Sequence, residues 1–201
     1  MAQINKPTDY FNTKLYTGNA TVRSITGVGF QPDWTWIKRR SGADNHYLFD
    51  AVRGVLKFLS SNGTGAEVTR ASSLTSFDSD GFSLGTHGDV NSSGQTFASW
   101  SWLGGNGTAS NTDGSITSTV SANTTSGFSI VSYTGTGSVA TVGHGLGVAP
   151  KMVICKARSD TGDWQVYHAG VGATKLTRLN LTDATITNSI WQKYSTNINS
   201  I

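Results

Sequence analysis

Two tryptophans, Trp34 and Trp36, lie two residues apart in the stretch GVGFQPDWTWIKRR and are followed at once by three cationic residues. On a β-strand, residues two apart point to the same face of the sheet. The pair could therefore form an aromatic platform on which a sugar ring or a nucleic-acid base stacks. The alternatives are a buried strand whose tryptophans fill a core, or a subunit interface.

A related stretch 118 residues later separates these interpretations. Residues 145–158 read GLGVAPKMVICKAR, so Met152 and Ile154 stand where Trp34 and Trp36 stand in the first stretch. Every replacement along the strand itself is apolar, on both faces, which is the pattern of a strand covered on both sides. We therefore expect the tryptophan pair to be packed in a core, with ligand stacking as the weaker alternative.

The cations at the strand ends are kept in both stretches. Each pair lies two residues apart, so its members project together from one face. We predict a surface cation patch at Lys38, Arg40, Lys156 and Arg158. A salt-bridged interface and a contact with a polyanion are the alternatives. The net charge of +3 is mild for so few charged residues, and no nucleic-acid partner is expected.

Residues that commonly catalyse reactions or bind metals are few and dispersed. No HxH or HxxxH spacing of metal ligands occurs among the four histidines, His46, His87, His144 and His168. His87 and Asp89 lie near several serines, but no GxSxG elbow is present. Residues 78–81, DSDG, resemble the start of a calcium loop but lack its later ligands. We predict no enzyme activity, no metal site and no cofactor.

The elements that position these residues are predicted to be β-strands. Among 201 residues there are 24 glycines and one glutamate, and only 13 % are charged, so good helix formers are scarce. One helical turn is expected, at 55–60. Residues 82–84 and 97–102 are expected to pair like a hairpin across a long loop, with a bulge in the second strand. The other strands of the first half are expected at 11–16, 21–25, 34–38 and 47–52. Short strands between Gly- and Asn-rich turns indicate a β-sandwich or barrel.

Internal similarity divides the chain into two tandem copies of one module. FNTKLYTG at 11–18 matches FSIVSYTG at 128–135, and residues 27–41 match residues 145–159. The second copy is expected to be incomplete at its carboxyl terminus and to expose an unpaired sheet edge. The predicted division is a first β-sandwich module of jelly-roll or lectin-like type at 1–105, a linker followed by a strand at 106–126, and a second, truncated β module at 127–201.

Aromatic residues near this edge and near the Gly104-Gly105 break are the predicted interface residues. Aromatic side chains are enriched in the cores of protein–protein interfaces. The residues are Trp164, Trp191 and Tyr194 in the second module and Trp100 and Trp102 in the first. For Trp100 and Trp102 a place in the core is the alternative. A contact between subunits is expected to complete the second module; strands from the first module, or no added strand if residues 180–201 form an arm, are the alternatives.

No targeting signal is recognisable in the sequence. The first residues, MAQINKPTDYF, lack the basic and apolar regions of a signal peptide, and no apolar run approaches the roughly 20 residues of a membrane span. We expect a chain made in a cytoplasm with no membrane span. The single cysteine, Cys155, permits no disulfide within the chain.

Several blocks together resemble a repeat module of tailed-phage structural proteins, which is abundant in phages of marine bacteria. The resemblance covers residues 10–190. The blocks are YFNTKLYTGN, SITGVGFQPDWTWIKRR, SLTSFDSDGFSLG, TFASWSWLGG, GFSIVSYTGTG, GHGLGVAPKMVICK and DWQVYH.

The resemblance implies a virion protein of tail-fibre, appendage or adaptor type, synthesised in the host cytoplasm. It implies other virion proteins as partners and brings no catalytic residues. We expect a homo-oligomer, a trimer if the chain belongs to a fibre, because closed symmetry is usual for such assemblies. A host-surface glycan is a further expected partner. The alternatives are a capsid decoration or head-fibre protein and a carbohydrate-binding, lectin-like module.

Overall fold

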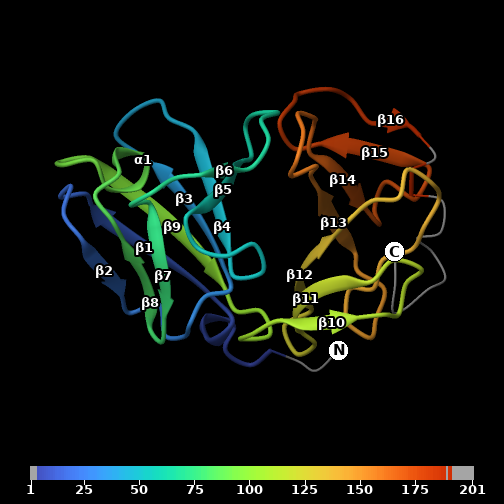
Figure 1. The fold of residues 1–201 in the computed structure, drawn as a ribbon, viewed down its shortest axis with the longest axis horizontal. Coiled ribbons are helices and arrows are strands. Elements are labelled where there is room, and N and C mark those ends of the chain that lie inside the picture. The colour runs from blue at the N-terminus through green and yellow to red at the C-terminus, as the bar shows by residue number, and fades with distance from the viewer. Residues whose placement is uncertain (1–3, 189, 192–201) are drawn as a thin grey trace.

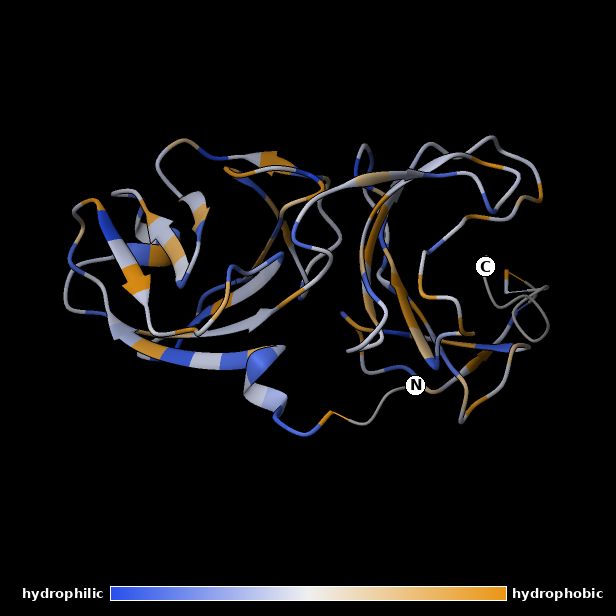
Figure 2. Cartoon of the chain, turned by 90° about the horizontal axis from the view of Figure 1, so that it is seen from below, coloured by the Kyte–Doolittle hydropathy of each residue, from blue (hydrophilic) through white to orange (hydrophobic). Residues whose placement is uncertain are grey.

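Antiparallel strands build the described part of the chain, which comprises residues 4–188, 190 and 191 of this computed structural model (Figure 1). Strands account for 41 % of the structure and helices for 4 %, which confirms the predicted all-β class. The strands form two groups that lie side by side in both views (Figures 1 and 2). The group from residues 4–105 is called the first half, and the described residues from 106 onward are called the second half.

Two sheets make up the first half. The larger has the strand order β1-β9-β3-β4-β5-β6, and the smaller has the order β2-β8-β7. Two short helices accompany them, η1 (Pro7–Asp9) and α1 (Gly88–Asn91). The strands are β1 (Phe11–Thr17), β2 (Arg23–Thr26), β3 (Trp34–Arg39), β4 (His46–Asp50), β5 (Lys57–Ser60), β6 (Val68–Thr69), β7 (Leu74–Asp78), β8 (Gly81–Leu84) and β9 (Thr96–Trp102).

The core of the first half lies between its two sheets. Phe49 and Phe97 from the larger sheet and Phe82 and Leu74 from the smaller one belong to a single hydrophobic cluster and are fully buried. Because side chains alternate along a strand, each of these strands presents its other face away from the cluster. The packing of two antiparallel sheets over one core is that of a β-sandwich-like fold.

Strand β9 lies between β1 and β3 and pairs antiparallel with both. Its register runs from Phe11↔Trp102 to Thr17↔Thr96 on one side and begins at Trp34↔Trp102 on the other. The predicted hairpin between 82–84 and 97–102 is therefore wrong, because β8 pairs with β2 and β7 in the smaller sheet. The expected bulge in β9 is also wrong, since both of its registers run without a shift.

The predicted helical turn at 55–60 is wrong as well. Residues Lys57–Ser60 form β5, which pairs with β4 and β6. Leu56 has a positive φ of 67°, and its amide donates to the carbonyl of Leu74 at 2.9 Å. Pairing with the neighbouring strands β4 and β6 thus overrides a local preference for helix at this point.

Two sheets, of three and four strands, make up the second half, with the orders β10-β11-β12 and β13-β14-β15-β16. Strand β10 lies inside the stretch predicted to be a linker, and β11 follows it in an antiparallel pair. No helix in the described part of the chain has the length and apolar character needed to cross a membrane. The strands are β10 (Ala109–Asn111), β11 (Ser118–Asn123), β12 (Phe128–Tyr133), β13 (Met152–Cys155), β14 (Gln165–His168), β15 (Lys175–Arg178) and β16 (Ile186–Thr187).

One pairing register occurs in both halves, 118 residues apart. In the first half Trp36 faces Leu48 and Leu48 faces Leu59, through β3, β4 and β5. In the second half Ile154 faces Val166 and Val166 faces Thr177, through β13, β14 and β15. Each number in the second set exceeds its counterpart by 118, so these three strands are aligned in the same way in both halves.

The turn that follows the middle strand recurs too. Gly54 and Gly172 have positive φ angles of 90° and 88°. The amide of Gly54 donates to the carbonyl of Asp50 at 3.1 Å, and the amide of Gly172 donates to the carbonyl of His168 at 3.2 Å. Glycine adopts such angles without steric cost, which explains why it stands at both positions.

Candidate binding site

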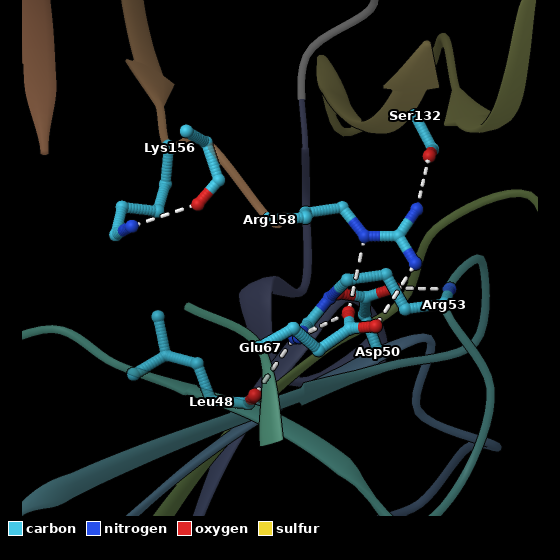
Figure 3. Close-up of polar contacts among 8 residues, drawn as sticks. Leu48, Asp50, Arg53, Glu67, Ser132, Lys156 and Arg158 are labelled. Atoms are coloured by element: carbon cyan, nitrogen blue, oxygen red, sulfur yellow. Dashed lines mark hydrogen bonds and ion pairs between the residues drawn. The ribbon is translucent and has the colours of Figure 1, made fainter. Parts of the chain in front are cut away.

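The two halves are joined by ion pairs around Glu67 (Figure 3). Arg158 donates to both carboxylate oxygens of Glu67, from Nη2 to Oε1 at 3.0 Å and from Nε to Oε2 at 3.1 Å. Arg53 Nη1 also donates to Glu67 Oε2, at 3.3 Å, and Arg53 Nε pairs with Asp50. On its other side, Arg158 Nη1 donates to Ser132 Oγ at 2.7 Å. This network, called the joint, links β4 and β6 of the first half to the loop after β13.

The electrostatics of the joint depend on the single glutamate in the sequence. Burial works to raise the pKa of Glu67, but the hydrogen bonds and charges of Arg158 and Arg53 outweigh burial and hold the pKa below its ordinary value. Arg158 was predicted to belong to a surface cation patch. It is not a free cation there, because its guanidinium is paired with the Glu67 carboxylate. The presence of only one glutamate was a signal that sequence reasoning left unused.

The other members of the predicted cation patch do not form one free surface either. Lys38 Nζ donates to the carbonyls one and four residues ahead, at 2.7 and 3.4 Å. Lys156 Nζ makes the same two contacts, at 2.7 and 3.2 Å, and lies apart from the joint (Figure 3). Burial lowers the pKa of Lys156, against the nearby charges of Asp160 and Asp163. Each lysine thus ties down a loop, whereas Arg40 is exposed.

An indole from the second half covers the larger sheet of the first. Trp164 is only 5 % exposed and belongs to a cluster with Leu48 and Leu59. Its Nε1 donates to the carbonyls of Ser60 and Gly63, at 2.9 and 3.1 Å. The interface that Trp164 forms lies within the chain, between the two halves.

Trp34 packs against other rings but, like Trp36, is only partly buried, so the predicted burial of the pair in a core is met in part. Its ring lies 4.6 Å from the ring of Trp102 and stacks on Phe128 of β12 at 5.6 Å, measured between ring centroids. Trp34 and Trp36 both border the cluster around Trp164. The outer face of the larger sheet is therefore covered in part by the second half, which is why its strands carry apolar residues on both faces.

A shallow hollow of about 260 Å³ remains on this aromatic face, lined by Trp36, His46, Trp100 and Trp102. Trp36 Nε1 donates to His46 Nδ1 at 2.9 Å, which leaves Nε2 to carry the proton of the neutral imidazole. Burial, followed by the charge of Lys38, lowers the pKa of His46. The hollow is thus an uncharged aromatic surface at neutral pH. It can contact the flat face of a ring by stacking.

The remaining predicted interface residues are divided by the structure. Trp100 lines the hollow and lies edge-on to Trp36, with ring centroids 6.4 Å apart. Trp102 lines the hollow too and also packs against Trp34. Trp191 lies 6.1 Å from the ring of Tyr167. Tyr194 lies outside the described residues.

The residues considered for catalysis or metal binding serve local structure. His87 Nδ1 accepts a hydrogen bond from the amide of Asp89 at 3.2 Å and caps α1. The Asp80 carboxylate accepts hydrogen bonds from the amides of Gly27 and Gly29, at 2.8 and 2.7 Å, and these bonds lower the pKa of Asp80. Over residues 4–188, 190 and 191, no group of three or more His, Cys, Asp or Glu residues is placed to hold a metal ion.

Asp33 is a structural anchor that the sequence reasoning missed. Its side chain is fully buried, and its carboxylate accepts hydrogen bonds from the amides of Gly104 and Asn106, at 2.8 and 3.1 Å, and from Ser121 Oγ at 3.1 Å. It therefore fixes the segment that leads from the first half to the second. The corresponding residue of the second stretch is Lys151, which is exposed, and this replacement of an acid by a base was the available signal.

Comparison with known proteins identifies the family of this chain but gives no activity for it. The family described as "Domain of unknown function (DUF7483)" matches residues 6–201, nearly the whole chain. Searches of the curated proteins and of the solved structures found no match. The function must therefore be argued from the site itself.

Proposed function

Because the chain belongs to the family described as domain of unknown function DUF7483, which assigns no activity, we propose from its geometry that it is a structural protein of a bacteriophage virion. It acts by protein–protein assembly as a component of a tail fibre, appendage or adaptor. It is a binding protein and catalyses no reaction. The resemblance of its sequence blocks to tailed-phage structural proteins supports the virion location.

The recurrence of one strand register in both halves is the observation that carries this proposal. We take the halves to be two tandem copies of one β-sandwich module of jelly-roll or lectin-like type. The matched pairings of β3–β5 and β13–β15 support this, as do the two lysines that tie down their loops in the same way. Tandem modules of this kind build extended surfaces at low sequence cost, which is what a virion appendage requires.

The use of the polar side chains also supports assembly over catalysis. In the described residues, Glu67 and Asp33 are committed to the segments that join the halves. Asp80 and His87 are committed to a turn and a helix cap. None of these groups lines the aromatic hollow. A surface without an acid–base pair is suited to binding and not to bond cleavage.

Labelling of purified phage particles tests the proposal. An antibody raised against the chain is expected to decorate the tail or its appendages in electron micrographs. Particles from a phage that lacks the gene provide the control and should show no label. Particles that contain none of the chain would contradict a structural role.

In light scattering, a stable monomer at all concentrations would contradict the expected homo-oligomer.

Glycan binding is the second candidate function, and the hollow favours it. Three indoles and an imidazole surround a space of about 260 Å³, and sugar rings stack on such surfaces. Titration with host-surface polysaccharide is expected to change tryptophan fluorescence, and Trp100→Ala should abolish the change. The exposed residue Val22 offers a control, Val22→Ala, which should bind normally. Release of reducing ends during the titration would mean an enzyme and would contradict both candidates.

A further inference from the structure

Among the described residues, two strands of the second half are paired along one edge only. Strand β12 pairs with β11 on one side, and β13 pairs with β14 on one side. Within the described residues neither has a partner on its other side. In the first half, the strands at the corresponding positions are β1 and β3, and both pair with β9 between them. The second half thus presents the two outer strands of this arrangement without the middle one.

We propose that β12 and β13 form a slot that accepts an extended strand from a neighbouring polypeptide. The added strand pairs with β12 and β13 as β9 pairs with β1 and β3. An unpaired strand edge is a row of amide and carbonyl groups that readily binds another strand. The slot depends only on the pairing of the described strands and holds whatever particle the chain belongs to.

Side-chain contacts show that β12 and β13 face each other across a narrow space. Tyr133 Oη, at the end of β12, lies 3.5 Å from Cys155 Sγ, at the end of β13. Arg158, three residues after Cys155, reaches Ser132 of β12 at 2.7 Å. Each contact joins one long side chain to a short one, which fits backbones about 10 Å apart; this is two strand spacings and leaves room for one strand.

The apolar surface beside the slot is exposed where its counterpart in the first half is covered. Tyr16 is 8 % exposed, whereas Tyr133, 117 residues later, is 43 % exposed. The ring of Tyr16 stacks on Phe97 of β9, with centroids 5.1 Å apart. Tyr133 has no such cover within the described residues, so a ring from an added strand would bury it.

The first half also defines the chemistry of the incoming strand. It runs antiparallel to both neighbours and carries a bulky apolar residue opposite Tyr133, as Phe97 stands opposite Tyr16. The core-facing positions that follow are small, like the buried Ser99 and Ser101 of β9. A proline inside the strand is excluded, because the strand donates hydrogen bonds on both edges.

The chain's own β9 is not available for this role. Both of its edges are already occupied, by β1 and by β3, over the length of the strand. The other edge of β12 is occupied by β11, which belongs to the hairpin with β10. The added strand therefore comes from a neighbouring polypeptide.

A synthetic peptide with the sequence of residues 95–103, QTFASWSWL, tests the slot on the full chain. Hydrogen exchange followed by mass spectrometry should show that amides of β12 and β13 exchange about tenfold more slowly with saturating peptide. A peptide with Ser99→Pro is the control and should give no protection, because proline cannot donate to the ladder. Equal protection by both peptides, or none by either, would overturn the proposal.

A protein variant provides a second readout that does not depend on exchange. Tyr133→Ala is expected to weaken peptide binding about tenfold in calorimetry, since an aromatic side chain that becomes buried on binding carries much of the affinity. Val139, which is also exposed, gives the matched control Val139→Ala with unchanged affinity. An unchanged affinity in Tyr133→Ala would show that the peptide binds elsewhere and would also overturn the proposal.

Discussion

The two halves of the molecule share one strand register but differ in how far their cores are closed. In the first half, five fully buried core residues come from the segment after β6: Leu74, Phe82, Leu84, Val90 and Phe97. The described residues of the second half supply no set that takes their place beside β12 and β13. The strands β13, β14 and β15 nevertheless pair in the same register as β3, β4 and β5.

This difference teaches that register and burial are specified separately. The register follows from the turn glycines and the alternation of the strands, both of which are local features. Burial requires side chains that arrive from strands far along the chain. The second half has the strand register but lacks the side chains that would complete its burial. It therefore keeps its strand pairing and leaves apolar side chains exposed, such as Tyr133 and Met152.

Removal of a core ring should give the largest contrast between the halves. Phe82→Ala empties a fully buried site between the two sheets and is expected to lower the free energy of unfolding by about 3–5 kcal/mol. Tyr133→Ala removes a ring that is nearly half exposed and should cost about 1 kcal/mol or less. Urea unfolding of both variants measures the difference. Equal losses would mean that the second half is as well packed as the first.

The buried aspartate should give the next largest contrast. Asp33→Ala leaves two amides and one hydroxyl without their acceptor and is expected to cost about 2–4 kcal/mol. The corresponding exposed residue of the second half gives the variant Lys151→Ala, which should stay within about 0.5 kcal/mol of the unaltered chain. Thermal unfolding of the two variants makes the comparison. A harmless Asp33→Ala would show that the segment between the halves is held by other contacts.

The joint should make stability depend on acid. Glu67→Gln leaves Arg158 without a carboxylate and Arg53 with that of Asp50 alone, and is expected to cost about 1–3 kcal/mol at neutral pH. Because the folded-state pKa of Glu67 lies below its ordinary value of 4.5, this stabilisation is complete above that value. It is lost as the pH falls through the folded-state pKa. Melting temperatures measured from about pH 7 to about pH 3 should therefore fall less in Glu67→Gln than in the unaltered chain.

An exposed cation from the predicted patch serves as the control for the joint. Arg40 has no side-chain ion pair among the described residues, so Arg40→Gln should melt with the pH profile of the unaltered chain. Identical pH profiles for Glu67→Gln and the unaltered chain would exclude Glu67 as the source of the acid dependence.

The glycine turns should give the smallest effect and no contrast. Gly54 and Gly172 have nearly the same positive φ, and a Cβ at either would meet no atom within 4 Å. Gly54→Ala and Gly172→Ala should each cost about 1 kcal/mol, because only backbone strain is introduced. Denaturant unfolding checks the equality. Clearly unequal costs would mean that the two turns are not structurally equivalent.

The sequence predicted those parts of the fold that depend on neighbouring residues. The alternation around Trp34 and the repeated Gly and Pro positions placed β3 and its entry. Residues 152–155 form a strand, β13, but the prediction that this strand is covered on both faces is wrong, since Met152 is 49 % exposed. What the alternation could not say is which strands pair. Strand β9 finds partners about 85 and 65 residues away, and a pattern of period two is equally compatible with a hairpin.

Only part of the candidate site was named from the sequence. Trp36, Trp100 and Trp102 line the hollow, but His46 beside them and Glu67 in the joint were not among the predicted site residues. That Trp164 would cover this sheet from within the same chain depends on how the halves pack, which no local pattern encodes. The pairing of Glu67 with Arg158 spans 91 residues and was hidden for the same reason.

The contact between the halves has a mechanical consequence. Trp164 is wedged against Leu48 and Leu59, and the two-pronged pair of Arg158 with Glu67 fixes the direction in which the halves meet. The buried Trp164 indole opposes bending of one half against the other, and the two hydrogen bonds between Arg158 and Glu67 oppose rotation of the halves. We therefore expect the two halves to move together under a pulling or twisting load, because bending must withdraw Trp164 and rotation must break the pair of Arg158 with Glu67.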